Sequence, residues 1–246
     1  MPDNLFAFKQ FSINQSHCAM KIGTDAVLLG ALVQIHEPIK SILDIGTGTG
    51  LLALMLAQKS ERYTDIHIDA IEIDKPACEQ ATENFNQSKW KHRLKAFNCS
   101  LQNFKDQQHQ YDLIISNPPF FRFKKNIAII EEQKSNARHD KALPFEELAN
   151  HTNRLLKSTG KFWLILPMQE GTEFIKIARQ ENLYVSQQIL VQPKPGKEPN
   201  RMVLCFVKVD GSIANKQLCI YDEKGNATKE YYDLTNEYLL WLNKKN

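Results

Sequence analysis

Apolar runs alternate with amphipathic stretches along most of this chain. The β-branched runs 66–73 (IHIDAIEI) and 111–116 (YDLIIS) are typical of buried strands, whereas 49–58 (TGLLALMLAQ) is apolar nearly all round and predicts a covered helix. This pattern predicts strands at 41–45, 66–73, 94–98, 111–116, 161–166, 183–191 and 201–209. It predicts helices at 49–58, 76–87, 144–157 and 171–181, with a turn at 158–160.

Strands that alternate with helices predict an α/β fold with a mostly parallel sheet and helices on both faces. In such sheets the ligand crevice lies outside the carboxyl ends of the strands. A motif that directly follows a strand is therefore expected near the crevice. Beyond residue 210 the pattern changes to a short strand near 217–221, a turn at 222–226 and a short helix near 236–242, which indicate an add-on.

The composition is that of an ordinary globular protein. Of 246 residues, 42% are hydrophobic and 24% are charged, and a net charge of +3 permits an acidic partner such as RNA without demanding one. No apolar run approaches a membrane span, and the start lacks the features of a signal peptide. Five cysteines without a CxxC pair, and histidines without an HxxxH pattern, favour a reducing cytoplasm and no metal.

A glycine-rich turn, 44–50 (DIGTGTG), separates the first predicted strand of the sheet from its helix. Such a turn lets a ligand approach the backbone and the free amides of a helix start. The spacing is G-x-G-x-G, because Leu51 stands where the dinucleotide fingerprint has its third glycine, and this weakens a dehydrogenase interpretation. Glu72 ends the next strand, where a carboxylate accepts hydrogen bonds from ribose hydroxyls, while Asp74 is expected to cap the following helix.

Asn117-Pro118-Pro119-Phe120 directly follows the strand 111–116 and is expected at the same edge. Prolines fix the backbone, so the Asn117 side-chain oxygen and the Pro118 carbonyl form two rigid acceptors beside the flat face of Phe120. A planar amino group on a ring, such as that of adenine, fits two acceptors and a stacking wall.

These motifs resemble motifs I, II and IV of class I S-adenosylmethionine-dependent N-methyltransferases, which have a Rossmann-like fold. The N-terminal run FKQF … MKIGTDAVLLG within 8–30 is more specific: it is similar to the bacterial tRNA-Val adenine N6-methyltransferase family, which modifies position 37 beside the anticodon. Residues 137–139 and 193–201 also fit that family, and the resemblance covers about 6–209. It implies three parts: 1–40 as an extension that caps the cofactor site, 41–209 as the methyltransferase domain, and 210–246 as an add-on of unknown role.

The resemblance implies roles for individual residues. The residues expected to bind S-adenosylmethionine are Thr24, Asp44, Gly46, Thr47, Gly48 and Glu72, with Asp25 beside Thr24 over the methionine end. Ser100 is the best match to an acid that many members carry after the third strand. The residues expected to hold the target adenine for catalysis are Asn117, Pro118, Pro119 and Phe120. An in-line displacement of this kind needs no metal and acts chiefly by positioning.

Three basic stretches compete as the tRNA contact. The stretch 89–95 precedes a strand, so we interpret it as a solvated turn at the far edge of the sheet. The other two follow strands and flank the expected crevice: Arg122, Lys124 and Lys125, and Lys194, Lys197 and Arg201. Arg138 and His139 are either substrate contacts or part of a polar linker.

Other functions remain open from the sequence. A protein glutamine N5-methyltransferase presents a similar planar amide, and a ribosomal RNA guanine N2-methyltransferase is a further alternative. A non-catalytic adenosine-binding or RNA-binding module would leave Asn117 and Pro118 without a purpose.

Overall fold

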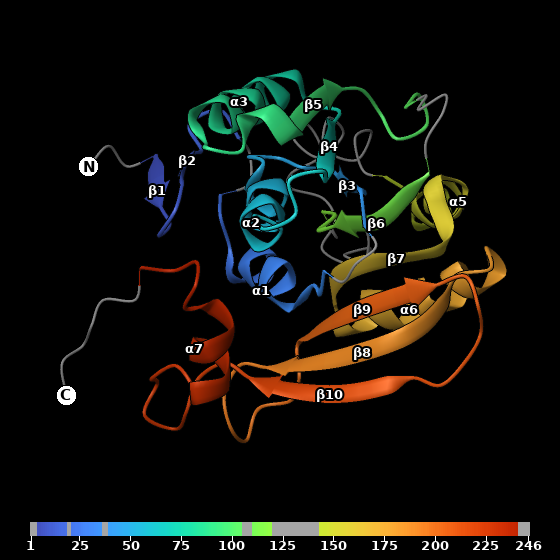
Figure 1. Ribbon diagram of the computed structural model, residues 1–246. Helices are drawn as coiled ribbons and strands as arrows, with labels where there is room; N and C mark the ends of the chain where they lie inside the picture. Colours follow the sequence, from blue (N-terminus) through green and yellow to red (C-terminus); the bar gives the residue numbers. More distant parts are fainter. Residues whose placement is uncertain (1–3, 19–20, 36–38, 105–109, 120–142, 241–246) are drawn as a thin grey trace, which may run out of the picture.

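An eight-stranded sheet organises the chain in a computed structural model that describes residues 4–18, 21–35, 39–104, 110–119 and 143–240 (Figure 1). Its strands are β3 (Ser41–Ile45), β4 (His67–Glu72), β5 (Leu94–Asn98), β6 (Tyr111–Ser116), β7 (Leu156–Pro167), β8 (Tyr184–Gln192), β9 (Arg201–Val207) and β10 (Ala214–Cys219). They lie in the order β10-β8-β9-β7-β6-β3-β4-β5. Only β9 runs antiparallel to its neighbours, so the predicted mostly parallel sheet is confirmed.

Helices cover both faces of this sheet, as predicted. One face packs under α1 (Thr24–Leu32), α2 (Leu51–Lys59) and α3 (Lys75–Gln87), and the other under α5 (Phe145–Leu155) and α6 (Met168–Gln180). Every residue of α2 except Lys59 is buried, because the helix lies between the sheet and α1. Asp74 caps α3 through the amide of Ala77, as the sequence predicts.

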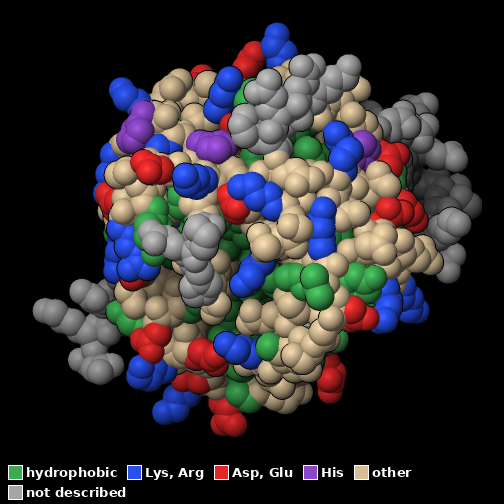
Figure 2. Space-filling view, turned by 45° about the vertical axis from the view of Figure 1, so that its right-hand side comes forward, with side chains coloured by type: hydrophobic (Ala, Val, Ile, Leu, Met, Phe, Trp, Pro, Cys, Tyr) green, Lys and Arg blue, Asp and Glu red, His purple; other side chains and the backbone are tan. Residues whose placement is uncertain are grey.

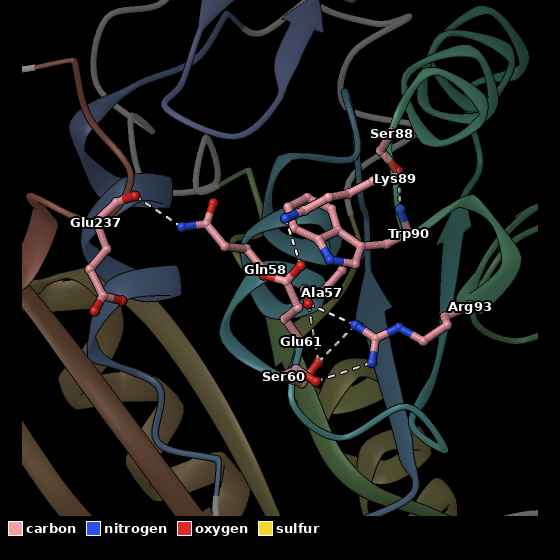
Figure 3. A network of polar contacts seen from close by, with 9 residues as sticks. All are labelled: Ala57, Gln58, Ser60, Glu61, Ser88, Lys89, Trp90, Arg93 and Glu237. Atoms are coloured by element: carbon pink, nitrogen blue, oxygen red, sulfur yellow. Dashed lines mark hydrogen bonds and ion pairs between the residues drawn. The ribbon is translucent and has the colours of Figure 1, made fainter.

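Two cations, the half-buried Lys59 and the buried Arg93, contact the ends of these helices. Lys59 Nζ donates to the carbonyls of Gly30, Ala31 and Val33 at the end of α1, and burial lowers the pKa of its ammonium group to about 8. Arg93 donates to the carbonyls of Ala57 and Ser60 at the end of α2 (Figure 3). Both groups satisfy carbonyls that a helix leaves unpaired.

The first and last described segments of the chain meet on one side of the molecule. A hairpin of β1 (Leu5–Ala7) and β2 (Ser12–Asn14) precedes α1, and α7 (Lys229–Thr235) follows β10 (Figure 1). Phe8 forms an antiparallel bridge with Leu239, and Gln58 donates to the carbonyl of Glu237. The tail is therefore joined both to α2 and to the turn of the N-terminal hairpin.

Two local predictions are wrong. The expected turn at 158–160 lies inside β7, which starts where Leu156 pairs with Tyr111 and continues through a bulge. Gly160 fits there because an added Cβ would lie 2.9 Å from the Tyr111 carbonyl oxygen, so this glycine permits a close strand approach rather than a turn. In the tail the helix is α7, which begins earlier than expected because Thr228 caps its start by accepting from the amide of Tyr231, and it ends at Thr235, before the expected 236–242.

Candidate active site

The ends of three neighbouring strands bring the predicted motifs together. Ile45 at the end of β3 pairs with Ile71 of β4 on one side and with Ser116 of β6 on the other. Neighbouring strands lie about 4.8 Å apart, so residues that follow paired positions stay close. The next residue on each of the three strands belongs to a predicted motif: Gly46, Glu72 and Asn117.

The glycine turn needs its glycines for two different reasons. Gly46, Gly48 and Gly50 have φ values of 71°, 57° and 83°, in the left-handed region that favours glycine. An added Cβ on Gly50 would lie 2.5 Å from the ring of Phe85, so this residue also allows α3 to pack closely. A Cβ on Gly46 or Gly48 would meet no atom within 4 Å, so the turn keeps an open side.

Asp44 and Thr47 hold the turn from beneath. Asp44 is fully buried, and its Oδ2 accepts a 2.6 Å hydrogen bond from the Thr47 hydroxyl. Burial raises the pKa of Asp44 to about 7; the Glu72 charge adds to this, while hydrogen bonds from Thr47 and the Ala53 amide oppose it. Asp44 Oδ1 is buried and accepts no hydrogen bond from the described residues.

Glu72 is the half-buried acid at the end of β4. Its Oε2 accepts from the amide of Gly48 at 2.9 Å, and its Oε1 accepts from the amide of Asp74 at 2.9 Å. The carboxylate is thereby fixed against the glycine turn. Each carboxylate oxygen can accept a further hydrogen bond, so the group remains available to a hydroxyl-bearing ligand.

The neighbouring ends of β4 and β5 add residues that the sequence pattern did not single out. Asn98 donates to the carbonyls of Glu72 and Ile73, and Ile73 is 51% exposed. An exposed apolar side chain directly after Glu72 offers a wall for a flat ring. Ser100, the predicted replacement for an acid, accepts from the amide of Asn103 and so starts a turn. Exposure at a strand end is set by the fold, which is why alternation alone did not identify Ile73.

The Asn-Pro-Pro elbow begins beside the glycine turn. The Ser116 hydroxyl donates to the Ile45 carbonyl at 2.8 Å, which ties the end of β6 to the residue before Gly46. Pro118 is buried and Pro119 is exposed. Asn117 Oδ1 is shielded from solvent and accepts no hydrogen bond among the described residues, a state that costs about 1–3 kcal/mol for a buried acceptor. Phe120 lies outside the described residues.

The segment between β2 and α1 lies against the same site. Asn84 of α3 donates to the carbonyls of Thr49 and of Asn14, the last residue of β2, and so joins the start of this segment to the glycine turn. Cys18 is near enough to the acids that burial, then the charges of Glu72 and Asp74, raise the pKa of its thiol to about 11. No sequence motif predicts that Cys18 lies here.

Thr24 is exposed at the first position of α1, and the side chain of its neighbour Asp25 contacts Arg201. Asp25 Oδ2 accepts from Arg201 Nε at 2.7 Å, although the two residues are far apart in sequence. The start of α1 is thereby connected to the start of β9 at the carboxyl edge of the sheet.

The basic stretches fall into different surroundings. Lys194 and Lys197 are exposed in the loop between β8 and β9, and Arg201 at its end pairs with Asp25. The other candidate contacts, Arg122, Lys124, Lys125, Arg138 and His139, lie outside the described residues. On the face drawn in Figure 2, Lys and Arg side chains are interspersed with Asp and Glu, so this face carries no patch of a single charge.

The interpretation of 89–95 as a solvated turn is wrong for one residue. Arg93 is only 7% exposed, because its guanidinium group reaches the end of α2, where it also donates to the Tyr63 carbonyl. Lys89 does lie at the surface and pairs with Glu61 at 2.6 Å (Figure 3). Arg93 therefore stabilises the fold and is not a tRNA contact.

Within the described part of the chain, no group of three or more His, Cys, Asp or Glu side chains is arranged to hold a metal ion. Over the same residues, no helix is long and apolar enough to cross a membrane.

The fold and this site define a class of protein. The family model "Methyltransferase small domain" matches residues 15–183. A predicted O-methyltransferase from Agrobacterium tumefaciens superposes with a TM-score of 0.67 over 87% of this chain and 96% of that one, at 19% identity, which shows the shared fold. The chain is a class I S-adenosylmethionine-dependent methyltransferase.

Relatives of higher identity narrow the class. The tRNA1(Val) (adenine(37)-N6)-methyltransferase of Flavobacterium psychrophilum is 43% identical over 96% of this chain and 99% of its own length. The protein of the same name from Tolumonas auensis is 38% identical over 98% of both chains. The chain belongs to the tRNA1(Val) (adenine(37)-N6)-methyltransferase family, as the sequence motifs indicate.

The described residues fit S-adenosylmethionine. The glycine turn has an open side where Gly46 and Gly48 lack a Cβ, and the Glu72 carboxylate retains acceptor capacity beside it. Ile73 adds an exposed apolar wall next to that acid.

Proposed function

We propose that this chain transfers a methyl group from S-adenosylmethionine to the exocyclic N6 of adenine 37 in tRNA1(Val). The observation that carries the proposal is the adjacency of Asn117 to the glycine turn, with Ile45 and Ser116 paired in register and joined by a hydrogen bond. The names of the full-length relatives support the same substrate.

The cofactor is proposed to lie over the turn between β3 and α2. Glu72 would accept hydrogen bonds from the ribose hydroxyls, and the backbone of the turn would approach the cofactor on its open side. Asp44 and Thr47 would hold the shape of the turn from its buried side. The full proposed set of cofactor residues is Thr24, Asp44, Gly46, Thr47, Gly48, Glu72 and Ser100.

The adenine is proposed to bind at the elbow. Asn117 Oδ1 and the Pro118 carbonyl would accept the two hydrogens of the N6 amino group, which supplies a donor to an oxygen that receives none from residues 4–18, 21–35, 39–104, 110–119 and 143–240. Since this oxygen is shielded from solvent, the Asn117 amide must turn toward the incoming base. Pro119 would stiffen the elbow, and Phe120, outside the described residues, would stack on the ring.

S-adenosylmethionine supplies a methyl group that its sulfonium already activates. The two acceptors would favour a pyramidal amino nitrogen whose lone pair forms the new N–C bond as the C–S bond breaks. The extra N6 proton then leaves to water, so no basic side chain is required. Positioning of this kind contributes up to about 7–11 kcal/mol to a reaction.

Phosphates of the tRNA are proposed to contact the loop between β8 and β9. Lys194 and Lys197 are exposed there, while Arg201 would also hold Asp25 and so is the most constrained of the three. Arg122, Lys124 and Lys125 would extend this surface beyond the described residues.

The three parts of the chain are proposed to serve this one site. Residues 1–40 would cap the cofactor, supported by the contacts of Asn84 with Asn14 and Thr49. Residues 41–209 would form the catalytic domain, and 210–246 would be an add-on. The proposed compartment is the cytoplasm, where tRNA is modified.

The test is methylation of tRNA lacking this modification, followed by nucleoside mass spectrometry and mapping of the modified position. N6-methyladenosine at position 37 of tRNA1(Val) is the expected product. Methyl label in a protein glutamine, in ribosomal RNA guanine, or in no substrate would contradict the proposal.

The tRNA surface has its own test. The double variant Lys194→Ala/Lys197→Ala should reduce the slope of log K against log salt by about 1.4, since each lost phosphate contact on a single strand contributes about 0.7. An unchanged slope would contradict the placement of this surface without affecting the assigned reaction.

A further inference from the structure

Tyr221 lies where the C-terminal tail meets the basic loop. After β10, the amide of Ile220 donates to the Gln192 carbonyl at 2.9 Å, and the amide of Tyr221 donates to the Pro193 carbonyl at 3.1 Å. Pro193 opens the loop that carries Lys194 and Lys197. The backbone of Tyr221 is thus fixed to the loop proposed to contact tRNA.

The Tyr221 ring packs against a neighbouring ring but remains partly exposed to solvent. It is 40% exposed, and its centroid lies 6.3 Å from that of the buried Tyr231 at an interplanar angle of 68°. An edge-to-face contact covers at most one face of a ring. The bridge between Tyr221 and Ala227 fixes the residue from the other side of its turn. The result is a preorganised aromatic surface, which loses little conformational entropy when a ring stacks on it.

The charged side chains around Tyr221 favour phosphate binding only modestly, because acidic residues stand among the basic ones. Glu198 stands in the same loop as Lys194 and Lys197, and Asp222 follows Tyr221. Asp222 is occupied within its own turn, where it accepts from the amide of Asn226 at 2.8 Å. Stacking attracts a base without depending on net charge, so an aromatic face here supplies what the balanced charges do not.

The position of Tyr221 defines which part of a tRNA it can reach. The strand order β10-β8-β9-β7-β6 places four strand spacings between the end of β10 and the elbow after β6, about 19 Å along the carboxyl edge. A group at that distance cannot touch the reacting adenine. Unpaired bases in RNA loops are the ones available for stacking on aromatic side chains.

We propose that Tyr221 stacks on an unpaired base of the tRNA substrate, away from the reacting adenine, and that the C-terminal tail thereby forms part of the tRNA-binding surface. This inference rests on the proposed function. It assigns Tyr221 to binding and not to catalysis.

The experiment compares Tyr221→Ala, Tyr221→Leu and Tyr221→Phe in the full-length protein, by filter binding of tRNA1(Val) across a salt series. Loss of one base–aromatic contact should weaken tRNA binding about 5- to 100-fold in Tyr221→Ala. Tyr221→Phe should bind within about twofold of the parent, because the stacking face is kept. Tyr221→Leu keeps apolar bulk beside Tyr231 and should bind as weakly as Tyr221→Ala.

Ile213→Ala is the matched control, since Ile213 is 49% exposed just before β10, at the opposite edge of the sheet. It should bind tRNA as the parent does. All variants should bind S-adenosylmethionine like the parent and reach the same kcat at saturating tRNA.

The melting temperature of Tyr221→Leu first shows that the variant is folded. The inference is overturned if this variant binds tRNA as tightly as the parent, or if Tyr221→Phe binds tRNA as weakly as Tyr221→Ala. Equal weakening by Ile213→Ala would also overturn it. Stacking releases no counterions, so Tyr221→Ala should leave the salt slope unchanged. A salt slope equal to that of the parent in Lys194→Ala/Lys197→Ala would instead contradict the proposed phosphate contacts of the loop between β8 and β9. A failure of the Tyr221 inference can therefore be told apart from a failure of those proposed contacts.

Discussion

Arg201 Nε donates to Asp25 Oδ2 across 2.7 Å and connects the first turn of α1 to the first residue of β9. Both side chains are about three-quarters covered, with exposed fractions of 27% and 23%. The contact joins the segment proposed to cap the cofactor to the loop proposed to bind tRNA. One ion pair thus links the proposed binding regions of S-adenosylmethionine and tRNA.

This pair should be detectable in a double-mutant cycle. Asp25→Asn and Arg201→Ala should each lower the free energy of unfolding, with a coupling of about 1 kcal/mol between them. Urea unfolding of the two single variants and the double variant measures that coupling. Strictly additive effects would show that the pair contributes nothing, and Arg179→Ala, whose partner Asp210 is largely exposed, is the control.

Asn117→Ala should strongly slow methylation without weakening the fold. Loss of one positioned hydrogen-bonding group of this kind lowers kcat by about 10²–10³. Because Asn117 Oδ1 is shielded from solvent and accepts no hydrogen bond from the part of the chain that the structure describes, its removal should leave the melting temperature unchanged or raise it. Nucleoside mass spectrometry and thermal unfolding check the two expectations, and Asn215→Ala on exposed β10 is the control. Full turnover by Asn117→Ala would remove the role proposed for this side chain.

Glu72→Gln should weaken binding of S-adenosylmethionine about tenfold or more. A Gln side chain presents an NH2 to one of the two amides that now donate to Glu72, from Gly48 and Asp74, and so loses a charge-assisted hydrogen bond. Isothermal titration calorimetry measures the affinity. Glu79→Gln, at an exposed site on α3, should bind like the parent; equal affinities in all three proteins would contradict the assignment of Glu72.

Asp44 should make the protein less stable as the pH rises. Burial raises the pKa of this carboxyl from 3.8 to about 7, so between these values the folded state keeps a proton that the unfolded state has released. The free energy of unfolding then falls with rising pH, by at most about 1.4 kcal/mol per pH unit from this group. Urea unfolding at pH 4 to 8 should show a smaller decline for Asp44→Asn than for the parent. Parallel pH profiles would contradict the shifted pKa.

Arg93→Ala should destabilise the fold by about 3 kcal/mol, because it removes the hydrogen bonds that a charged, buried side chain donates to the carbonyls of Ala57, Ser60 and Tyr63. Chemical denaturation measures the loss. Lys91→Ala, an exposed neighbour in the same basic stretch, should change stability by less than about 0.5 kcal/mol. A change in stability as small as that of Lys91→Ala would contradict the structural role of Arg93 and would support the solvated turn that the sequence predicted.

The sequence predicts that the glycine turn, Glu72 and Asn117 follow neighbouring strands at one edge of the sheet, because its signals are local. Glycine spacing and a Pro-Pro corner are short patterns, and the rule that ligands bind at the carboxyl ends of parallel strands brings them together without knowledge of distant contacts. The paired ends of β3, β4 and β6 agree with that rule. The fold class follows for the same reason, from strands and helices that alternate along the chain.

What the sequence did not predict depends on contacts between distant residues. The burial of Arg93 requires the end of α2 as its partner, and the Asp25–Arg201 pair spans most of the chain. The sequence around Gly160 predicts a turn, and only the close approach of the Tyr111 carbonyl explains why a glycine is needed there. Composition and periodicity contain no information on such partners.

The bridge between Phe8 and Leu239 has a consequence for biosynthesis. The hairpin that leads into the start of α1 finds this partner only after nearly the whole described chain has left the ribosome. A nascent chain would form its central sheet first and close its amino-terminal region last. Emergence of Leu239, rather than of the glycine loop, would therefore mark the moment at which this amino-terminal region can close.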